Sequence, residues 1–263
     1  MPKPRFISFP DQKTLADELA AHFLSALQQD LSDNELVHVS LTGGTMGSKI
    51  LETAGELRAL KDIDWSRVHF WWSDERFVPT GHEDRNSQQA ADALLASLDI
   101  PAENLHVIGA SDQFDTAEKA AEAYRQELKK FAPTGAEYPT FGLSLLGMGP
   151  DGHIASLFPH RPEIHEEMAI TLAVHDSPKP PPHRVTLTRP VICNSQQIWF
   201  MVSGEDKNAP LTRVMQASSV KDEELSADIL TETPAAGARG LEKTIIWADA
   251  AAQGNLKFSA EAR

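Results

Sequence analysis

The feature that most constrains the fold of this chain is a regular alternation of short apolar runs with longer segments of helical periodicity. Leu15, Leu19, Phe23 and Leu27 recur every four residues, which indicates a helix with one apolar face that Asp11 can cap. Further helices are expected through 51 to 60 and at 87–98, 116–131, 206–217 and 226–231. Strands are expected at 6–9, 36–41, 68–72, 105–108, 141–147, 169–174, 185–187, 198–202 and 244–247.

The order strand, helix, strand implies a sheet whose strands are mainly parallel and whose two faces are both covered. We therefore predict an α/β fold: a mainly parallel Rossmann-like sheet with helices on both faces, and a smaller strand-rich flank in the second half. There is no internal repeat and no long linker, so 1–263 is predicted to form a single α/β domain. The proline-rich segment Ser177–His183 is predicted to be a stiff connecting loop, with a polyproline ligand as the less favoured alternative.

Composition and charge argue against several classes of protein. The formal net charge is -14 and no cluster of Lys and Arg forms a stripe for phosphates, so nucleic acid is not an expected partner. No apolar run approaches the roughly 18 residues of a membrane span, and the N-terminal residues lack the core of a signal peptide. We therefore expect no membrane partner and a cytoplasmic location. Cys193 is the only cysteine and the histidines lack metal-ligand spacing, so neither a disulfide, a metal nor a cofactor is expected.

The segment Phe141–Pro159 is the strongest candidate for a functional site. Its apolar start is dense enough for a buried strand, and it then breaks into a loop with three glycines that delivers Asp151 and His153. A histidine can accept and return a proton near neutral pH, which suits acid–base chemistry at the rim of a sheet. On this segment alone, a plain turn with a solvent-facing histidine is an equally good interpretation. The glycines match G-x-G-x-x-G, but no acidic strand end follows about 20 residues later, which argues against a dinucleotide site.

A pair of glycines follows the second expected strand. Thr42–Thr45 lies between that strand and a helix, and small residues there let backbone N–H groups approach a ligand. The helix N-terminus that follows favours an anion, so we predict that Gly43, Gly44 and Thr45 bind phosphate. The spacing does not match a Walker A loop, and an ordinary strand-to-helix turn is the alternative.

Charged side chains follow other expected strands. Ser73–Arg76 comes directly after a strand with two adjacent tryptophans. Within it, Asp74 can take part in proton transfer or hold a substrate hydroxyl, and Arg76 can bind a phosphate. A surface salt-bridge cluster is the alternative. Arg184 and Lys207 stand at the edges of later strands, where an open parallel sheet gathers its ligand groups.

Taken in order, five segments resemble the 6-phosphogluconolactonase family, and the resemblance covers nearly the whole chain. The segments are Leu41–Thr45, Ser73–Arg76, Gly147–Pro159, Pro181–Thr186 and Gly204–Lys207. Three positions depart from the usual family pattern: Gly47 replaces a common proline, Ile154 a common threonine, and His183 a common acidic residue. None of these changes removes a group assigned to chemistry, although His183 adds a titrating neighbour to Arg184.

Glucosamine-6-phosphate deaminases are similar to this chain at the glycine loop and at Asp151–Ala155. They follow that second segment with Phe-Asn-Glu, whose glutamate serves ring opening, whereas this chain has Ser156, Leu157 and Phe158. Because a phenylalanine cannot exchange protons, the resemblance favours the lactonase over the deaminase. A non-catalytic phosphosugar sensor is a further alternative, but we expect neither end of the chain to hold a basic helix-turn-helix segment.

The resemblance implies hydrolysis of a small-molecule phosphosugar lactone, 6-phospho-D-glucono-1,5-lactone, to 6-phospho-D-gluconate in the oxidative pentose phosphate pathway. His153 would act as general base and then acid, Asp151 would orient the imidazole or the loop, and Asp74 would bind hydroxyls or support the base. Substrate and phosphate binding are assigned to Gly43, Gly44, Thr45, Arg76, Asn86, Arg184 and Lys207. As the alternative for segment 84–87, Asn86 or Ser87 is expected to cap a helix. A monomer or small homo-oligomer is expected.

Overall fold

The computed structural model describes residues 3–58, 62–218, 220 and 225–256, and within them seven strands form one parallel sheet. From edge to edge these strands are β1 (Arg5–Phe9), β10 (Lys243–Asp249), β9 (Ser195–Val202), β6 (Phe141–Gly147), β2 (Val37–Leu41), β3 (Val68–Trp72) and β5 (Leu105–His106). A small antiparallel sheet consists of β4 (Asp74–Arg76), β8 (Arg184–Leu187) and β7 (Thr171–Val174). The predicted α/β class, with a mainly parallel sheet and a smaller strand-rich flank, is confirmed.

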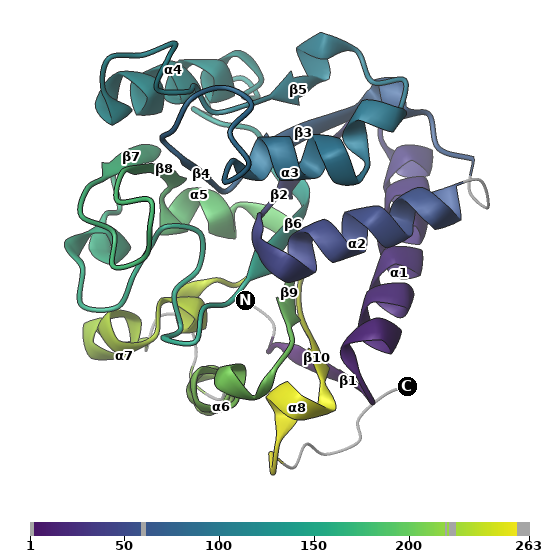
Figure 1. Ribbon diagram of the computed structural model, residues 1–263, viewed down its shortest axis with the longest axis vertical. Helices are drawn as coiled ribbons and strands as arrows, with labels where there is room; N and C mark the ends of the chain where they lie inside the picture. The colour runs from purple at the N-terminus through teal and green to yellow at the C-terminus, as the bar shows by residue number, and fades with distance from the viewer. Residues whose placement is uncertain (1–2, 59–61, 219, 221–224, 257–263) are drawn as a thin grey trace.

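Helices cover both faces of the large sheet. Helices α1 (Gln12–Asp33) and α2 (Gly44–Leu57) pack against each other on one face, and α5 (Arg189–Cys193) lies against the other (Figure 1). The other helices are α3 (Asn86–Ala93), α4 (Ala117–Lys130), α6 (Asn208–Ala217), α7 (Ala227–Glu232) and α8 (Ala250–Gln253). Short 3-10 helices are η2 (Trp65–Arg67), η3 (Leu95–Ser97), η4 (Ala102–Asn104), η5 (Pro162–His165), η6 (Glu205–Lys207) and η8 (Pro234–Gly237). Within the described residues, no helix is long and apolar enough to cross a bilayer.

Helix α1 shows how the local sequence determines local structure. The Asp11 carboxylate accepts a hydrogen bond from the Thr14 N–H at 2.7 Å, so the predicted cap is confirmed. All four apolar side chains of the predicted face are completely buried. The helix continues to Asp33, beyond the predicted end at 28, because Leu31 extends the buried face by one more turn.

Some other predicted elements are shorter than expected, and several observed elements were not predicted. Strand β5 ends at His106 instead of 108, because the Val107 N–H turns back to the carbonyl oxygen of Leu105 at 3.1 Å. The helix predicted over 87–98 ends early and gives way to η3. Strand β4 and helices α5 and α8 were not predicted, since elements this short show no clear periodicity. The predicted helix end at 60 and the outer residues of the predicted 1–263 domain lie outside the described residues.

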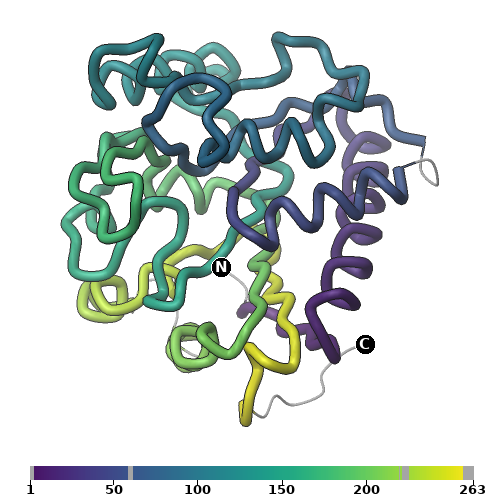
Figure 2. Tube along the Cα trace, viewed as in Figure 1, coloured from purple at the N-terminus to yellow at the C-terminus, as the bar shows by residue number. Residues whose placement is uncertain are grey.

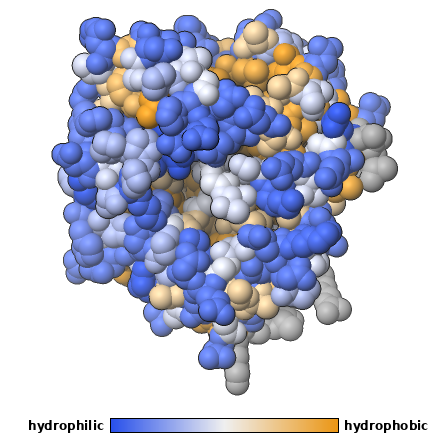
Figure 3. Space-filling view, viewed as in Figure 1, coloured by the Kyte–Doolittle hydropathy of each residue, from blue (hydrophilic) through white to orange (hydrophobic). Residues whose placement is uncertain are grey.

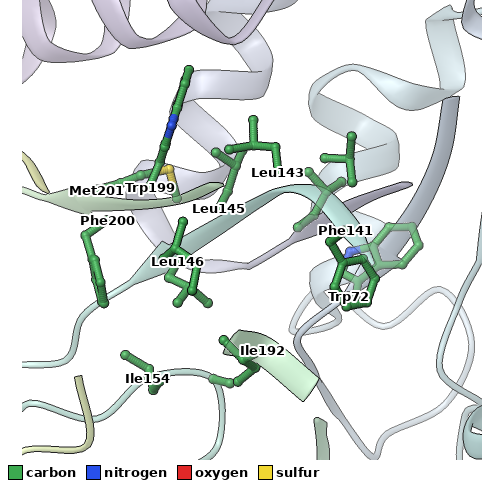
Figure 4. Packing of buried hydrophobic residues seen from close by; sticks show 14 of the residues in the cluster. Trp72, Phe141, Leu143, Leu145, Leu146, Ile154, Ile192, Trp199, Phe200 and Met201 are labelled. Carbon is green, nitrogen blue, oxygen red and sulfur yellow. The ribbon is translucent and has the colours of Figure 1, made fainter. Parts of the chain in front are cut away.

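The central strands are buried on both faces, which anchors the loops that leave them. Leu145 and Trp199 rise on one face of the sheet, whereas Leu146 and Phe200 point to the other, toward Ile154 (Figure 4). All five side chains are almost completely buried. Such near-continuous apolar runs are typical of central parallel strands. The loop after β6 therefore leaves from a rigid base.

Strands β2, β3 and β5 also carry a buried polar chain that was not predicted. His69 Nδ1 lies 2.9 Å from His106 Nε2, His106 Nδ1 lies 2.9 Å from Glu127 Oε1, and the Trp71 indole N–H donates to His38 Nδ1 at 3.0 Å. Burial lowers the pKa of His38 to about 3 and that of His106 to about 4, and it also lowers the pKa of His69. The three imidazoles are therefore neutral, with His69 and His106 buried and His38 half-buried beside them. Across the described part of the chain, no group of three or more His, Cys, Asp or Glu is placed to hold a metal ion.

Starting from the middle of the sheet, the chain adds strands toward both edges. Strands β2, β3 and β5 proceed toward one edge, and β6, β9 and β10 toward the other, so β2 and β6 are neighbours at a topological switch point. The Cα trace shows the segments from β3 to α4 in the upper part of the molecule and those from β9 to α8 in the lower part (Figure 2). The loops that follow β2 and β6 therefore diverge and open a crevice between them.

Candidate active site

A cleft of about 460 Å³ opens at the carboxyl ends of the central strands. The space-filling view shows a hollow beside the N-terminus of α2, with hydrophilic side chains around it (Figure 3). Ten site residues were predicted from the sequence, and Asp151 reaches the cleft only through its contact with His153. The other nine line the cleft directly: Gly43, Gly44, Thr45, Asp74, Arg76, Asn86, His153, Arg184 and Lys207.

Glycines at the start of α2 let a second segment approach the backbone closely. A Cβ on Gly43 would lie 1.8 Å from Asn86 Oδ1, so only glycine fits there. Gly44 has a φ of +84°, in the left-handed region that favours glycine. The N-cap residue Gly43 has no side chain, and the Gly44 N–H reaches Gln89 Oε1 at a long 3.4 Å. The first turn of α2 thus keeps N–H groups available to an anion in the cleft.

The loop after β6 brings Asp151 and His153 together. His153 Nδ1 lies 2.5 Å from Asp151 Oδ1, and the same oxygen accepts the His153 backbone N–H at 3.2 Å. The turn is tight: the Gly149 N–H donates to the His153 carbonyl at 2.9 Å, and Gly152 has a φ of +94°. A Cβ on Gly149 would lie 2.0 Å from His153 Nδ1 and 2.5 Å from Asp151 Oδ1. The pair therefore packs directly on the Gly149 backbone.

Local electrostatics keep the Asp151 carboxylate ionised. Burial by itself raises the pKa of Asp151, but the hydrogen bond with His153 and the charge of Lys179, 3.8 Å away, hold that pKa well below its usual range. An ionised carboxylate only accepts hydrogen bonds, so His153 Nδ1 is the donor in this contact, which does not involve Nε2. The ring centroids of His153 and Phe158 are 4.6 Å apart, and 16% of the His153 side chain is exposed. His153 is thus oriented on both sides and accessible.

Asp74 is held in the wall of the cleft by donors from three other segments. Its Oδ2 accepts the Ser156 hydroxyl at 2.7 Å, and its Oδ1 accepts the Asn86 side-chain amide at 3.2 Å. Arg184 Nη1 lies 3.8 Å from Asp74 Oδ2. With only 4% of the residue exposed, Asp74 is a fixed acceptor.

Glu75, which received no role from the sequence, holds α3 in place. Its carboxylate accepts the backbone N–H of Asn86 at 2.7 Å and that of Ser87 at 2.9 Å, and it lies 3.7 Å from Arg85 Nη2. Glu75 therefore caps α3, and the expectation that Asn86 or Ser87 caps this helix is wrong. Burial raises the pKa of Glu75, although Arg85 and the backbone donors oppose this effect. The cap leaves the Asn86 side chain to contact Asp74.

The three predicted cations of the cleft are each partly engaged by the protein itself. Arg76 Nη1 donates to the Asp84 carbonyl at 2.6 Å, and Lys207 Nζ lies 2.8 Å from a neighbouring carboxylate. Arg184, only 3% exposed, donates from Nε and Nη2 to the carbonyl groups of residues 179–181 at 3.0 to 3.2 Å. The structure thus uses Arg184 to hold this loop, and its predicted contact with phosphate would fall mainly to Nη1.

Lys179 was not predicted as a site residue, because Ser177–His183 has the composition of a connecting loop. The structure folds this loop over the cleft, where Lys179 Nζ lies 3.4 Å from His153 Nδ1. The prolines that follow the lysine are the one sequence signal for it, since they restrict the backbone and fix the direction of the side chain. Arg213 was missed as well, and it steadies the loop after β6 through a hydrogen bond to the Asp151 carbonyl at 3.1 Å.

The chain is thus an α/β protein whose parallel sheet places a glycine-rich helix start, several cations and an aspartate–histidine pair around one cleft at its switch point. The family model described as glucosamine-6-phosphate isomerases/6-phosphogluconolactonase matches residues 10–247. The chain therefore belongs to this family.

Individual relatives agree with this assignment. The chain is 37% identical over 261 residues to a 6-phosphogluconolactonase of Streptomyces coelicolor, which covers 97% of this chain and 96% of that protein. It is 40% identical over 242 residues to a 6-phosphogluconolactonase of Mycobacterium leprae, covering 90% and 92% of the two chains. The crystal structure of 6-phosphogluconolactonase from Thermotoga maritima matches with a TM-score of 0.78 at 26% identity, over 94% of this chain and 100% of that one.

Proposed function

We propose that this chain hydrolyses 6-phospho-D-glucono-1,5-lactone to 6-phospho-D-gluconate, a step of the oxidative pentose phosphate pathway, with His153 as general base. Relatives named 6-phosphogluconolactonase, at 37% and 40% identity over most of the chain, support the reaction. The observation that carries the mechanism is the 2.5 Å contact between His153 Nδ1 and Asp151 Oδ1 in the cleft. This contact leaves Nε2 as the free basic nitrogen.

Opening a lactone requires an activated water and a proton for the departing ring oxygen. In the proposed sequence, His153 Nε2 takes a proton from water as the water oxygen bonds to the carbonyl carbon. The tetrahedral oxyanion then collapses, the bond from carbon to the ring oxygen breaks, and the imidazolium returns its proton to that oxygen. Asp151 stabilises the imidazolium while it exists. Acid–base catalysis of this kind contributes about 10²–10⁴-fold, and no covalent enzyme intermediate is needed.

The phosphate group at the other end of the substrate supplies positioning. Its binding energy is available to fix the carbonyl group beside the activated water, because the phosphate itself does not react. In a chain with a net charge of -14, the cations of the cleft form the local positive island that such a ligand needs. The groups we assign to it are the backbone N–H groups of Gly43, Gly44 and Thr45 and the side chains of Arg76, Asn86, Arg184 and Lys207.

We assign Asp74 to binding the substrate hydroxyl groups. Its partners are Ser156, Asn86 and Arg184, whereas His153 is paired with Asp151. A carboxylate fixed by such donors is a rigid acceptor, and hydrogen bonds from hydroxyls to a charged acceptor are among the stronger ones. This role explains why the carboxylate lies in the cleft wall, away from solvent.

The same cleft argues against deamination of glucosamine 6-phosphate, the alternative enzyme that the sequence left open. Residues 156–158 follow the histidine loop where the deaminases carry a glutamate, and none of the three is acidic here. Ser156 is hydrogen-bonded to Asp74, and Phe158 packs against the His153 ring. These side chains support the lactonase residues and supply no proton donor for ring opening.

Freshly generated phosphogluconolactone tests the proposal. We expect opening well above the spontaneous rate, followed as proton release in weakly buffered solution. Glucosamine 6-phosphate should release no ammonia above background in a parallel assay. Lactone opening at the spontaneous rate would contradict the proposed function, and ammonia release would replace it with deamination.

A further inference from the structure

We propose that Lys179 is a further catalytic residue, which stabilises the negative charge that develops on the carbonyl oxygen of the lactone; this inference rests on the proposed hydrolysis. Lys179 Nζ lies 3.4 Å from His153 Nδ1 and 3.8 Å from Asp151 Oδ1, and Lys179 and His153 line the same cleft. The base must reach the attacking water, so the tetrahedral carbon forms next to the imidazole. Lys179 Nζ lies at the Nδ1 edge of the same imidazole ring, and the flexible lysine side chain, 37% exposed, lines the cleft in which the lactone would lie. Its ammonium can therefore approach the carbonyl oxygen as the negative charge develops.

The loop that carries Lys179 is fixed at the lysine itself. The Ser177 hydroxyl donates to the Lys179 carbonyl at 2.9 Å, and the Lys179 N–H reaches the same hydroxyl at 3.4 Å. Arg184 Nη2 also donates to the Lys179 carbonyl at 3.1 Å. Farther along the loop, the Ser177 N–H donates to the Pro182 carbonyl at 2.9 Å. Both backbone polar groups of Lys179 are thus bonded, as a preorganised catalytic group requires.

The anchor of this loop is rigid as well. Arg184 is buried, its Nη1 lies 3.8 Å from Asp74 Oδ2, and its guanidinium carbon lies 5.6 Å from the centre of the Phe158 ring. Phe158 in turn packs against His153. One buried arginine therefore connects the lysine loop, the ring that supports the base, and the carboxylate assigned to the substrate hydroxyls. This arrangement fixes the position of Lys179 relative to His153.

The surroundings of Lys179 suit it for stabilising an anion. Burial lowers the pKa of Lys179 and the nearby charges of Lys207 and Arg184 act in the same direction, whereas Asp151 favours its charged form. A partly desolvated ammonium interacts with a developing oxyanion more strongly than one in bulk water. Loss of one preorganised oxyanion donor typically costs about 10²–10³-fold in kcat.

The proposed step leaves the proton of Lys179 in place. The water oxygen bonds to the carbonyl carbon, the carbonyl π electrons move to the oxygen, and the water proton passes to His153. Lys179 interacts with that oxygen only while it is charged. When the carbonyl re-forms, the ring carbon–oxygen bond breaks and His153 protonates the departing oxygen, so Lys179 is an electrostatic catalyst with no net change.

Replacement of the lysine tests this role in the intact chain. We expect Lys179→Met to lower kcat about 100-fold or more with KM little changed, and Lys179→Arg to recover part of the loss because it keeps the charge. Lys207→Met is the matched control, since it removes a cation assigned to the phosphate and should chiefly raise KM. The Lys179 side chain is 37% exposed, so its replacement should leave the unfolding midpoint nearly unchanged. Lys179→Gln repeats the test with a polar side chain.

Two inhibitors distinguish the carbonyl end of the substrate from the phosphate end. In Lys179→Met, 6-phosphogluconate, which carries a carboxylate, should bind about 10-fold more weakly, whereas glucitol 6-phosphate, which lacks one, should bind as in wild type. Equal weakening of both inhibitors, or a raised KM with an unchanged kcat, would show that Lys179 binds phosphate and would overturn the proposal. An unchanged kcat would overturn it too. Wild type serves as reference: if it fails to open the lactone, the proposed function fails, independently of Lys179.

Discussion

Replacing Gly149 by alanine tests whether the Asp151–His153 pair needs its present geometry. The added Cβ would lie 2.0 Å from His153 Nδ1 and 2.1 Å from Cε1, whereas ordinary contacts begin at 3.4 Å. The imidazole must therefore move by about 1.4 Å, because the packed turn has no free space beside it. A displacement of about 1 Å at a catalytic group costs on the order of 10²-fold in rate. We expect kcat for lactone opening to fall about 100-fold.

The matched control is alanine at Gly147, two residues earlier in the chain. Gly147 also lines the cleft, but a Cβ there would meet no heavy atom within 4 Å and so leaves the Asp151–His153 pair in place. The kcat of Gly147→Ala should therefore stay close to that of wild type. Gly149 does not have a positive φ, so the backbone accepts alanine and the effect comes from the contact with the pair. Initial rates with freshly generated lactone give kcat for both variants, and the unfolding midpoint checks that both are folded. Wild-type kcat in Gly149→Ala would refute the argument that the packed pair carries catalysis.

Two further predictions concern stability. Burial lowers the pKa of His38 to about 3 and that of His106 to about 4, and it lowers the pKa of His69 as well. At a pH below the ordinary pKa of histidine, the unfolded chain therefore binds more protons than the folded chain. The free energy of unfolding should therefore fall as pH decreases from about 6.5 toward 4, by up to about 1.4 kcal/mol per pH unit for each histidine. Urea unfolding at a series of pH values measures this slope, and a flat profile over that window would contradict it. Glu75→Gln removes the charge that caps α3 and faces Arg85, and should cost about 2 kcal/mol in the free energy of unfolding; Glu83→Gln is the exposed control, and equal stability of the two variants would exclude the capping role.

Much of the site could be predicted because a parallel sheet gathers it. Three loops, at Thr42–Thr45, after β3 and after β6, each follow an apolar run that indicates a strand. The carboxyl ends of these parallel strands meet at one edge of the sheet. Polar residues placed directly after such strands were therefore expected to converge. The structure brings them to one cleft although Gly43 and Lys207 lie at opposite ends of the series.

What could not be predicted depends on contacts between distant segments without periodic patterns. Lys179 lies beside His153 in a loop that Arg184 holds by hydrogen bonds to its carbonyl groups. Glu75 caps α3 from 11 and 12 positions earlier in the chain, and a cap is recognised from sequence only when it directly precedes its helix. Burial of such charged groups depends on the folded chain as a whole, so no local sequence pattern predicts it.

Replacing His153 by alanine removes the proposed base itself. We expect kcat for lactone opening to fall by about 10²–10⁴-fold in His153→Ala. Binding of glucitol 6-phosphate should stay nearly unchanged, because the phosphate groups of the site are assigned to other side chains. A variant that keeps wild-type kcat, or that loses turnover and ligand binding to the same extent, would contradict the role of His153 as the base.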